Sequence, residues 1–457
     1  MDKPVIFLSN FHPYVTKNTL NSGVLDALSA RTKVIILVIK EKEEYFKGLY
    51  GKEGVIVEGI DLDLYIRSTR NKIFIRLSEL LLDTNVKKFH KMEALAKTGN
   101  WPNYYFSLLF TKIFAHIVPF KKLIRWLDYK FNNPKPFQKL FDVYKPNVVF
   151  ATDAFGDHDV FLLKNSRSTG VNNVAMVRSW DNTTSRGYLR FVPDKLIVHN
   201  EVMKEEMPKY HNINGGIIYL CGIPQFEKYI GMKPSSQEEF FKKIGASSQK
   251  RLILFTPAGH FFIDSDWQIC QILKDLYHEK KIPQDVQFVV RLHPFLPVDL
   301  SQFKPDDNFI IDAPGPAKPN ELGKSKKEGE LEMAFFQHIY DSIHYASLAI
   351  NTISSIIIDT AVFDKPLITI NFDGWLKNPP ILRSLLKRWR LEENQINWLN
   401  IGSTRLAGNK EELAKWINTY LENPELDRDK REIFKQRYCW KYDGKSAERI
   451  ASIVLSH

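Results

Sequence analysis

The chain has 457 residues, enough for two domains of ordinary size, and its 44% hydrophobic and 26% charged residues are typical of a globular protein. The net charge of +11 favours anionic partners such as phosphorylated substrates, acidic lipid surfaces or nucleic acid. The three cysteines are widely spaced and form no CxxC pair, which argues against a disulfide framework or a zinc site.

The N-terminus reads as the start of the fold. Residues 1–10 carry only a short apolar run, which is typical of a first core strand rather than a signal peptide. No stretch reaches the roughly 18 uninterrupted apolar residues of a membrane-spanning helix. We therefore expect a cytoplasmic protein and leave open a peripheral place on the inner face of the cell membrane.

Short apolar runs alternate with segments of helical period through the first half of the chain. These runs are residues 5–8, 34–39, 55–57, 148–151, 174–177 and 195–198. Strands of continuous Val, Ile and Leu that are separated by helices indicate a parallel sheet covered on both faces. We predict an N-terminal Rossmann-like domain over residues 1–235.

A second series of apolar runs predicts a second domain of the same α/β class. These runs are residues 251–256, 288–291, 309–311, 348–351 and 367–370. The polar stretch 232–239 is typical of a linker, so we place the boundary near residue 235 and the second Rossmann-like domain at 236–430. Residues 431–457 have a helical pattern, and fold analogy predicts that they pack back on the first domain.

Two segments interrupt the α/β rhythm. Residues 100–131 are rich in aromatics and bordered by Lys and Arg, which fits either a membrane-surface helix pair or a helix buried against the sheet. Burial is our preferred interpretation, because amphipathic helices usually face a core. Residues 314–330 combine Pro, Gly and charge, and we interpret them as a solvated loop, with a lid over a ligand as the alternative.

Basic and hydroxyl side chains follow strands of the second domain. Arg291 is the last residue of the run 286–291, and His293 follows two residues later. Both side chains can donate hydrogen bonds to phosphate, and Pro294 stiffens the turn. Open α/β sheets bind ligands at the carboxyl ends of their strands. The loop after residues 251–256, which contains Thr256 and His260, is predicted to reach the same edge.

A serine-rich segment follows a later strand of the same domain. Thr352, Ser354 and Ser355 place hydroxyls beside the free N–H groups of the next helix, which makes an anion cradle, although ordinary helix capping is the structural alternative. Asp359 lies one helical turn beyond Ser355, where its carboxylate can accept from ribose hydroxyls. The pair of elements predicts a site for a nucleoside mono- or diphosphate.

These motifs, in this order, resemble the C-terminal half of the CDP-glycerol glycerophosphotransferases. The segment Asp443-Gly with Ser446 and Arg449 extends the resemblance. The motifs are also similar to bacterial GT-B glycosyltransferases of surface polysaccharide synthesis, including enzymes that use CMP-sugars. The resemblance implies a GT-B fold, with two Rossmann-like domains facing each other across a cleft. It further implies a donor nucleotide in the C-terminal domain and an acceptor that enters from the N-terminal domain.

The resemblance also implies roles for individual residues. Arg291 and His293 would contact donor phosphate, Ser354 and Ser355 would hold phosphate, and Asp359 would bind ribose. The segment 178–187 departs from the glycerophosphotransferase pattern and looks like other surface-carbohydrate transferases, which favours transfer of a sugar over glycerol phosphate. We assign Arg178 and Asn182 to the acceptor side.

An inverting transfer needs a general base near the acceptor hydroxyl. Asp153, Asp157 and His158 follow a predicted strand and are our candidates, with Asp181 as an alternative. Helix capping explains such loop carboxylates equally well. We expect no tightly bound cofactor and no metal site, because cationic and N–H groups can stabilise the departing phosphate.

The leading hypothesis is a glycosyltransferase that moves a sugar from a CMP-, CDP- or UDP-linked donor to a hydroxyl of a surface glycan or lipid-linked acceptor. A CDP-polyol phosphotransferase and a sugar-nucleotide 2-epimerase are the enzymatic alternatives. The non-enzymatic alternative is a basic nucleic-acid-binding protein, which the even spread of Lys and Arg along the chain argues against. An anionic membrane surface is left open as a partner.

Overall fold

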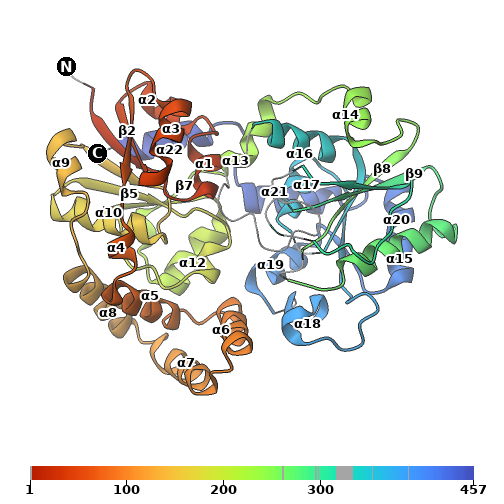
Figure 1. The fold of residues 1–457 in the computed structure, drawn as a ribbon, viewed down its shortest axis with the longest axis horizontal. Coiled ribbons are helices and arrows are strands. Elements are labelled where there is room, and N and C mark those ends of the chain that lie inside the picture. Colours follow the sequence, from red (N-terminus) through yellow and green to blue (C-terminus); the bar gives the residue numbers. More distant parts are fainter. Residues whose placement is uncertain are drawn as a thin grey trace. The chain divides into compact units, whose positions relative to one another are not determined.

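The computed structural model describes residues 3–259, 262–293, 296, 298–314, 333–352, 354–389 and 391–456. His260, Pro294 and most of the loop at 314–330 lie outside this part of the chain. The chain divides into two compact units, Met1–Lys228 with Arg437–His457, and Tyr229–Gln436. Each unit contains one parallel β-sheet with helices packed around it (Figure 1), so the predicted α/β class is confirmed.

The first unit has a seven-stranded sheet in the order β3-β2-β1-β4-β5-β6-β7. Its strands are β1 (Val5–Ser9), β2 (Lys33–Ile39), β3 (Val55–Ile60), β4 (Val148–Ala151), β5 (Asn172–Met176), β6 (Lys195–Val198) and β7 (Ile218–Leu220). All neighbours pair in parallel. The strand order reverses between β1 and β4, so the loops that follow these two strands form the topological switch point at which such sheets bind ligands.

Both faces of the first sheet are buried, which explains the unbroken apolar strands. Ile6 and Leu8 of β1 pack into one core together with Ile450 of α22 (Ser446–Leu455). Phe7, whose side chain points to the opposite face, packs into a second core with Phe137. The C-terminal helix therefore completes a core of the first unit.

The second unit has a six-stranded parallel sheet in the order β10-β9-β8-β11-β12-β13. Its strands are β8 (Arg251–Thr256), β9 (Val286–Arg291), β10 (Phe309–Asp312), β11 (Ala346–Asn351), β12 (Leu367–Ile370) and β13 (Arg405–Ala407). The order reverses between β8 and β11, which places the switch point of this sheet at the loops after those strands. The strand predictions missed β7 and β13, the two edge strands of three residues each.

Helices fill the connections of both units. In the first unit the other helices are α1 (Pro13–Thr19), α2 (Val24–Ser29), α3 (Glu43–Tyr50), α4 (Asp63–Ile66), α5 (Thr69–Leu80), α6 (Asn85–Thr98), α7 (Trp101–Phe114), α8 (Val118–Phe131), α9 (Gln138–Tyr144), α10 (Asp157–Ser168), α11 (Asn182–Ser185), α12 (Glu201–His211) and α13 (Pro224–Glu227). The later helices are α14 (Gln237–Ile244), α15 (Asp266–His278), α16 (Met333–Tyr345), α17 (Ile356–Val362), α18 (Leu385–Trp389), α19 (Glu393–Ile401), α20 (Lys410–Glu422) and α21 (Arg428–Cys439). Short 3-10 turns are η1 (Lys40–Lys42), η2 (Gly215–Ile217), η3 (Lys228–Gly231) and η4 (Ile381–Arg383).

The unit boundaries differ from the predicted ones. The first boundary lies between Lys228 and Tyr229 rather than near residue 235. Residues after it are held by the second unit, because Ser235 donates from both its N–H (3.0 Å) and its hydroxyl (2.8 Å) to the Asp341 carboxylate of α16. Beyond residue 430 the chain forms two helices instead of one, and residues 431–436 of α21 still belong to the second unit.

The aromatic segment forms the helix pair α7 and α8, on the part of the first unit drawn lowest in Figure 1. The preferred interpretation of this segment as a buried helix is wrong, because Trp101, Tyr105, Leu109 and Trp126 are each more than half exposed. Across the described ranges, no helix combines the length and the apolar character that a membrane crossing needs.

Candidate functional site

The loops after β8 and β11 meet at the switch point of the second sheet, and Asp266 ties them together. Its carboxylate accepts hydrogen bonds from the N–H groups of Gly259 (2.8 Å) and Ala258 (3.2 Å) and from the hydroxyl of Thr352 (3.4 Å). Burial raises the pKa of Asp266 to about 7, and these hydrogen bonds act against the rise. Asp266 was not predicted, because an Asp at the start of a helix is a common capping pattern.

Thr256 braces the sheet rather than facing a ligand. Its hydroxyl donates to the backbone carbonyl of Ile350 in the neighbouring strand (3.4 Å), and its own carbonyl accepts from the N–H of Thr352 (3.4 Å). These contacts fix the backbone from which the two loops leave. The predicted donor contact through His260, three residues after Pro257, lies outside the described residues.

Arg291 ends β9 as a buried cation. Its guanidinium lies over the ring of Phe335 at 5.6 Å, and the residue is only 8% exposed. The neighbouring Asp312 carboxylate takes a hydrogen bond from His338 (2.7 Å). Within the part of the chain that the structure describes, the buried Nε and Nη2 of Arg291 have no hydrogen-bond partner.

Burial of the Arg291 guanidinium without hydrogen-bond acceptors for Nε and Nη2 costs free energy. Desolvation lowers the pKa of Arg291, and the carboxylates of Asp312 and Asp359 oppose the shift. A buried N–H group without an acceptor carries a desolvation penalty of about 1–3 kcal/mol, and more when the group is charged. The arrangement is therefore suited to an anion that accepts hydrogen bonds from Nε and Nη2 together.

His293 lies two residues beyond Arg291 and is half-buried. Its Nδ1 accepts the backbone N–H of Leu296 at 3.0 Å. Because Nδ1 is the acceptor, a neutral ring carries its proton on Nε2, so that nitrogen is a hydrogen-bond donor. This tautomer fits the predicted contact of His293 with phosphate oxygen.

The serine-rich segment has mixed roles. The Ser354 hydroxyl accepts the N–H of Ile356 (3.3 Å), which is ordinary capping, whereas Ser355 is exposed and makes no capping bond with its side chain. Asp359 is buried in α17, and its carboxylate accepts the hydroxyl of Tyr229 (2.9 Å). Phosphate binding by the serines and ribose binding by Asp359 stay predictions.

The switch point of the first sheet carries a second polar cluster. Ser9 ends β1 and Thr152 follows β4; their hydroxyl oxygens lie 3.0 Å apart, and the Thr152 hydroxyl donates to the Ser9 carbonyl (2.8 Å). The Ser9 hydroxyl donates to Asp159, a fully buried carboxyl of α10. Burial, followed by the nearby Asp153 carboxylate, raises the pKa of Asp159 to about 8. Asp159 was also not predicted.

Asp153 and Arg178, which follow β4 and β5, form a buried ion pair with Oδ2 and Nη1 at 2.5 Å. Burial lowers the pKa of Arg178, and its Nε has no hydrogen-bond partner among the described residues. Asn182 is also buried, and its Oδ1 has no hydrogen-bond partner among the described residues. The structure thus brings the predicted base Asp153 and the predicted acceptor-side residue Arg178 into direct contact.

Asp181 stands at the N-cap position of α11, but its side chain makes no capping hydrogen bond with a backbone N–H group. Its carboxylate accepts the hydroxyls of Ser179 (2.5 Å) and Ser185 (3.1 Å) and, more weakly, the amide of Asn182 (3.3 Å). These contacts join it to side chains of its own loop and helix. A catalytic role for Asp181 stays a prediction.

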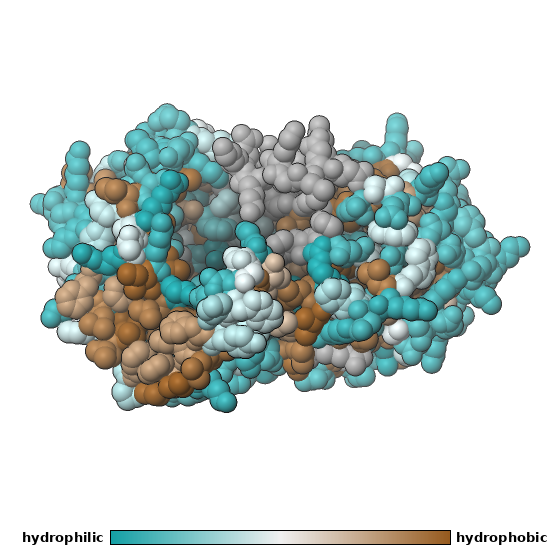
Figure 2. Space-filling model, turned by 60° about the horizontal axis from the view of Figure 1, so that its bottom comes forward, coloured by the Kyte–Doolittle hydropathy of each residue, from teal (hydrophilic) through white to brown (hydrophobic). Residues whose placement is uncertain are grey.

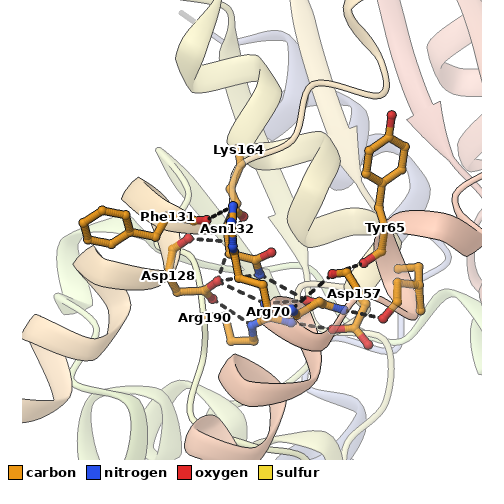
Figure 3. A network of polar contacts seen from close by, with 11 residues as sticks. Tyr65, Arg70, Asp128, Phe131, Asn132, Asp157, Lys164 and Arg190 are labelled. Carbon is orange, nitrogen blue, oxygen red and sulfur yellow. Dashed lines mark hydrogen bonds and ion pairs between the residues drawn. The ribbon is translucent and has the colours of Figure 1, made fainter.

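Asp157 and His158 have partners away from the Asp153–Arg178 pair. Asp157 accepts from Arg190 Nη1 (2.5 Å) at the edge of a buried ionic network around Asp128 (Figure 3). Burial raises the pKa of Asp157. The ring of His158 stacks on Phe11 with centroids 5.2 Å apart, and burial lowers its pKa. Asp153 contacts the predicted acceptor-side residue Arg178, whereas Asp157 contacts Arg190 and His158 stacks on Phe11, so Asp153 is the base that we prefer among the predicted ones.

His12 is a further residue at this edge that was not predicted. It precedes Pro13 directly after β1, so a His-Pro pair follows a buried strand here as it does at His293, and that repeated pattern was the available signal. His12 Nδ1 accepts the N–H of Tyr14 (3.1 Å). Burial, with Arg178 and other nearby cations, lowers the pKa of His12 to about 3, so the ring is neutral at physiological pH.

A pocket of about 260 Å³ in the second unit lies beside the start of α15. Its walls include the carboxyl groups of Asp264, Asp266 and Asp299. In the described ranges, no group of three or more His, Cys, Asp or Glu side chains is arranged to hold a metal ion.

The comparisons with known proteins agree with the motifs. Residues 168–377 match the family model described as CDP-Glycerol:Poly(glycerophosphate) glycerophosphotransferase. This range is slightly less than half of the chain. The matched range includes Arg178, Arg291, His293 and Asp359, and ends short of β13. The predicted resemblance is confirmed, with one correction: the segment 178–187, which we set apart from the family pattern, lies inside the match.

Solved structures with the same two-unit architecture are enzymes that act on nucleotide-linked substrates or transfer sugars. A putative UDP-N-acetylglucosamine 2-epimerase from Listeria monocytogenes has a TM-score of 0.55 at 12% identity over 100% of this chain and 97% of its own. UDP-GlcNAc 2-epimerase from Neisseria meningitidis, bound to UDP-GlcNAc, has a TM-score of 0.54 at 11% identity over 99% and 100%. A glycosyltransferase from Rickettsia africae has a TM-score of 0.50 at 11% identity over 100% of both chains.

These low identities establish the fold alone, which is the predicted GT-B fold. No curated protein matches the chain. The family match and the shared fold together support a transferase.

Proposed function

We propose that the protein transfers a sugar from a CMP-, CDP- or UDP-linked donor to a hydroxyl of a surface glycan or lipid-linked acceptor. The observation that carries the proposal is Arg291, a buried cation at the carboxyl end of a parallel strand with two N–H positions unpartnered among the described residues. The phosphate oxygens of such a donor supply the acceptors that Nε and Nη2 need. His293, two residues beyond Arg291, is our candidate for a further contact with the same phosphate.

On the acceptor side, Asp153 is the base that we favour. The acceptor hydroxyl attacks the anomeric carbon, the new glycosidic C–O bond forms, and the bond from that carbon to the donor phosphate oxygen breaks. The carboxylate takes the hydroxyl proton, and the nucleotide leaves with the electrons of the broken bond. Arg178 holds Asp153 in place through the 2.5 Å contact between its Nη1 and the Asp153 carboxylate.

Product mass tests this proposal. The full-length protein is incubated with a nucleotide sugar or with CDP-glycerol, each with a glycan primer on a lipid carrier, and the products are analysed by mass spectrometry. We expect primer extended by a sugar residue, with no phosphorus in the new linkage. Extension only from CDP-glycerol, by glycerol phosphate, would refute sugar transfer.

The second candidate function is transfer of a polyol phosphate from a CDP donor, and the family match favours it. The same anion site serves both reactions, since each begins with a nucleoside diphosphate or its ester. The two differ in the bond that breaks, at the sugar carbon or at the phosphorus. The epimerase alternative is distinguished by turnover of UDP-GlcNAc in the absence of any acceptor.

We also propose that the protein works at the cytoplasmic face of the membrane, where a lipid-linked acceptor is presented. The net charge of +11 supports association with acidic headgroups. We do not propose nucleic acid as a partner, because the family match and the fold both favour small nucleotide-linked substrates.

The Asp159 carboxyl supplies a prediction on pH. Its folded pKa of about 8 is raised above the ordinary value, so its neutral form stabilises the fold at low pH and this contribution is lost as pH rises from about 4 toward 8. We expect Asp159→Asn, which stays neutral, to raise the melting temperature by about 2–4 °C at pH 8.5 and to leave it unchanged at pH 4.5. Thermal unfolding followed by circular dichroism at the two pH values measures this, and an equal change at both would contradict the assignment.

A further inference from the structure

The helix pair α7 and α8 is packed with its polar side inward. The buried side chains of α7 are Ser107 and Thr111, and those of α8 are Lys121 and Asp128. Thr111 donates to the carbonyl of Leu80 (2.8 Å) and accepts from Lys91 (2.6 Å), and Arg76 donates to Ser107 (2.5 Å). Surface helices in water normally show the opposite arrangement, with the apolar stripe on the core.

The outward face of the pair is apolar and aromatic. Figure 2, which brings the bottom of Figure 1 forward, shows apolar residues gathered over the first unit where these helices lie. Six residues of this face are between 47% and 61% exposed, namely Trp101, Tyr105, Leu109, Ile113, Leu123 and Trp126. Contiguous apolar patches of this kind are rare on monomers and mark interaction sites.

The charges on this face have one sign. Asp128 is the sole carboxylate in the sequence of the two helices, and it is buried. Lys112, Lys122 and Lys130 are exposed, and Lys130 lies over the ring of Trp126 at 4.8 Å. Aromatic side chains beside lysines are the composition of helices that lie in the interface of an anionic bilayer.

The pair is held firmly against the first unit by charged and polar contacts. Asp128 accepts from Lys164 (2.7 Å) and from Arg190 (2.8 Å), as Figure 3 shows. On the same helix, Arg125 donates to the carbonyls of Leu189 and His211, both at 2.9 Å. The apolar face therefore keeps a fixed orientation and has no alternative burial against its own core.

We infer that α7 and α8 form a docking surface that lies in the headgroup region of an anionic lipid bilayer. Each helix has 14 residues, short of the roughly 20 that span a membrane, so the pair lies on the bilayer rather than crossing it. A second copy of the chain fits this surface less well than a bilayer, because a symmetric contact brings the three exposed lysines of one copy close to the same lysines of the other. This surface is independent of the donor chemistry, so its test is separate from that of the proposed function.

Vesicle flotation of the full-length protein tests the inference. We expect flotation with phosphatidylcholine vesicles that contain phosphatidylglycerol, and much less with phosphatidylcholine alone. The double variant Leu109→Ser/Trp126→Ser should lose flotation. The matched control Leu49→Ser, an equally exposed leucine on α3, should retain it. Each of Lys112→Gln, Lys122→Gln and Lys130→Gln should weaken binding on the order of 5-fold.

The results of flotation and of ultracentrifugation distinguish a lipid bilayer from a second copy of the chain as the partner of this surface. Because the altered side chains are exposed, the variants should melt as the wild type does, and circular dichroism checks this. Absence of flotation, or flotation that Leu109→Ser/Trp126→Ser leaves unchanged, would overturn the inference. Concentration-dependent dimers in analytical ultracentrifugation that the double variant abolishes, without flotation of the wild type, would assign the surface to a second copy instead.

Discussion

Asp128→Ala is expected to lower the free energy of unfolding by about 3–5 kcal/mol. The carboxylate is 2% exposed and neutralises two buried cations, Lys164 and Arg190. Without it, Lys164 loses the carboxylate that it contacts, and Arg190 keeps its contact with Asp157. Burial already lowers the pKa of Lys164 to about 8 despite the partner, which shows how poorly this site tolerates a lone ammonium.

Urea unfolding of the full-length protein at pH 7 measures the loss. The matched control is Asp26→Ala, which removes an exposed ion pair with Lys52 and should cost less than about 1 kcal/mol. The pKa of Asp128 is held below its usual value, because Arg190 and Lys164 outweigh the effect of burial. Its contribution is therefore present above pH 4 and lost as pH falls below that value. Equal losses of unfolding free energy in Asp128→Ala and Asp26→Ala would show that the buried network around Asp128 is not needed for stability.

Arg291→Ala is expected to weaken donor nucleotide binding by about 100- to 1,000-fold, the range for removing one partner of a buried, hydrogen-bonded charge pair. The ligand-free protein should be as stable as the wild type or more stable, since the substitution removes a buried cation with unpartnered N–H groups. That combination separates a binding role from a structural one.

Isothermal titration calorimetry with the preferred nucleoside diphosphate measures the loss, and thermal unfolding measures the stability. Arg251→Ala is the matched control. Arg251 begins β8, at the amino edge of the same sheet, and pairs with Asp285 through two hydrogen bonds of 2.8 Å. Its removal should leave nucleotide affinity unchanged. Equal affinities of the wild type and Arg291→Ala would remove Arg291 from the site.

The sequence predicted the strands well because both faces of each sheet are buried. Every residue of β4 and β9 is buried, so β4 is an unbroken apolar run and β9 is mostly apolar apart from Gln287 and Arg291. The missed strands β7 and β13 are short edge strands with partly exposed residues, and three residues carry too little pattern to separate a strand from a loop.

The site was predictable where one short segment carries the signal. Arg291 and His293 were found because they end an apolar run, and Arg178 and Asp153 because each follows one. Asp159 and Asp266 were missed, since what distinguishes them is burial against partners far away in the chain, such as Ser9 for Asp159. A carboxylate in the first turn of a helix looks the same in the sequence whether it caps the helix or is buried.

The helix pair at 101–131 was misjudged for a different reason. Periodicity shows that a helix has an apolar side, but not which side faces the protein. In α7 the inward side carries hydroxyls because Arg76 and Lys91 reach them from neighbouring helices, and neither residue belongs to the segment. The sequence alone therefore could not decide between burial and exposure.

The most direct test of the donor site is thermal unfolding of the full-length protein with CMP, CDP, UDP, GDP and dTDP. Binding to the folded state at 100 times the dissociation constant adds about 2.7 kcal/mol to stability. We predict stabilisation by a cytidine or uridine nucleotide that is absent in Arg291→Ala. No stabilisation by any of the five nucleotides, or the same stabilisation in Arg291→Ala, would contradict a donor site at the carboxyl end of β9.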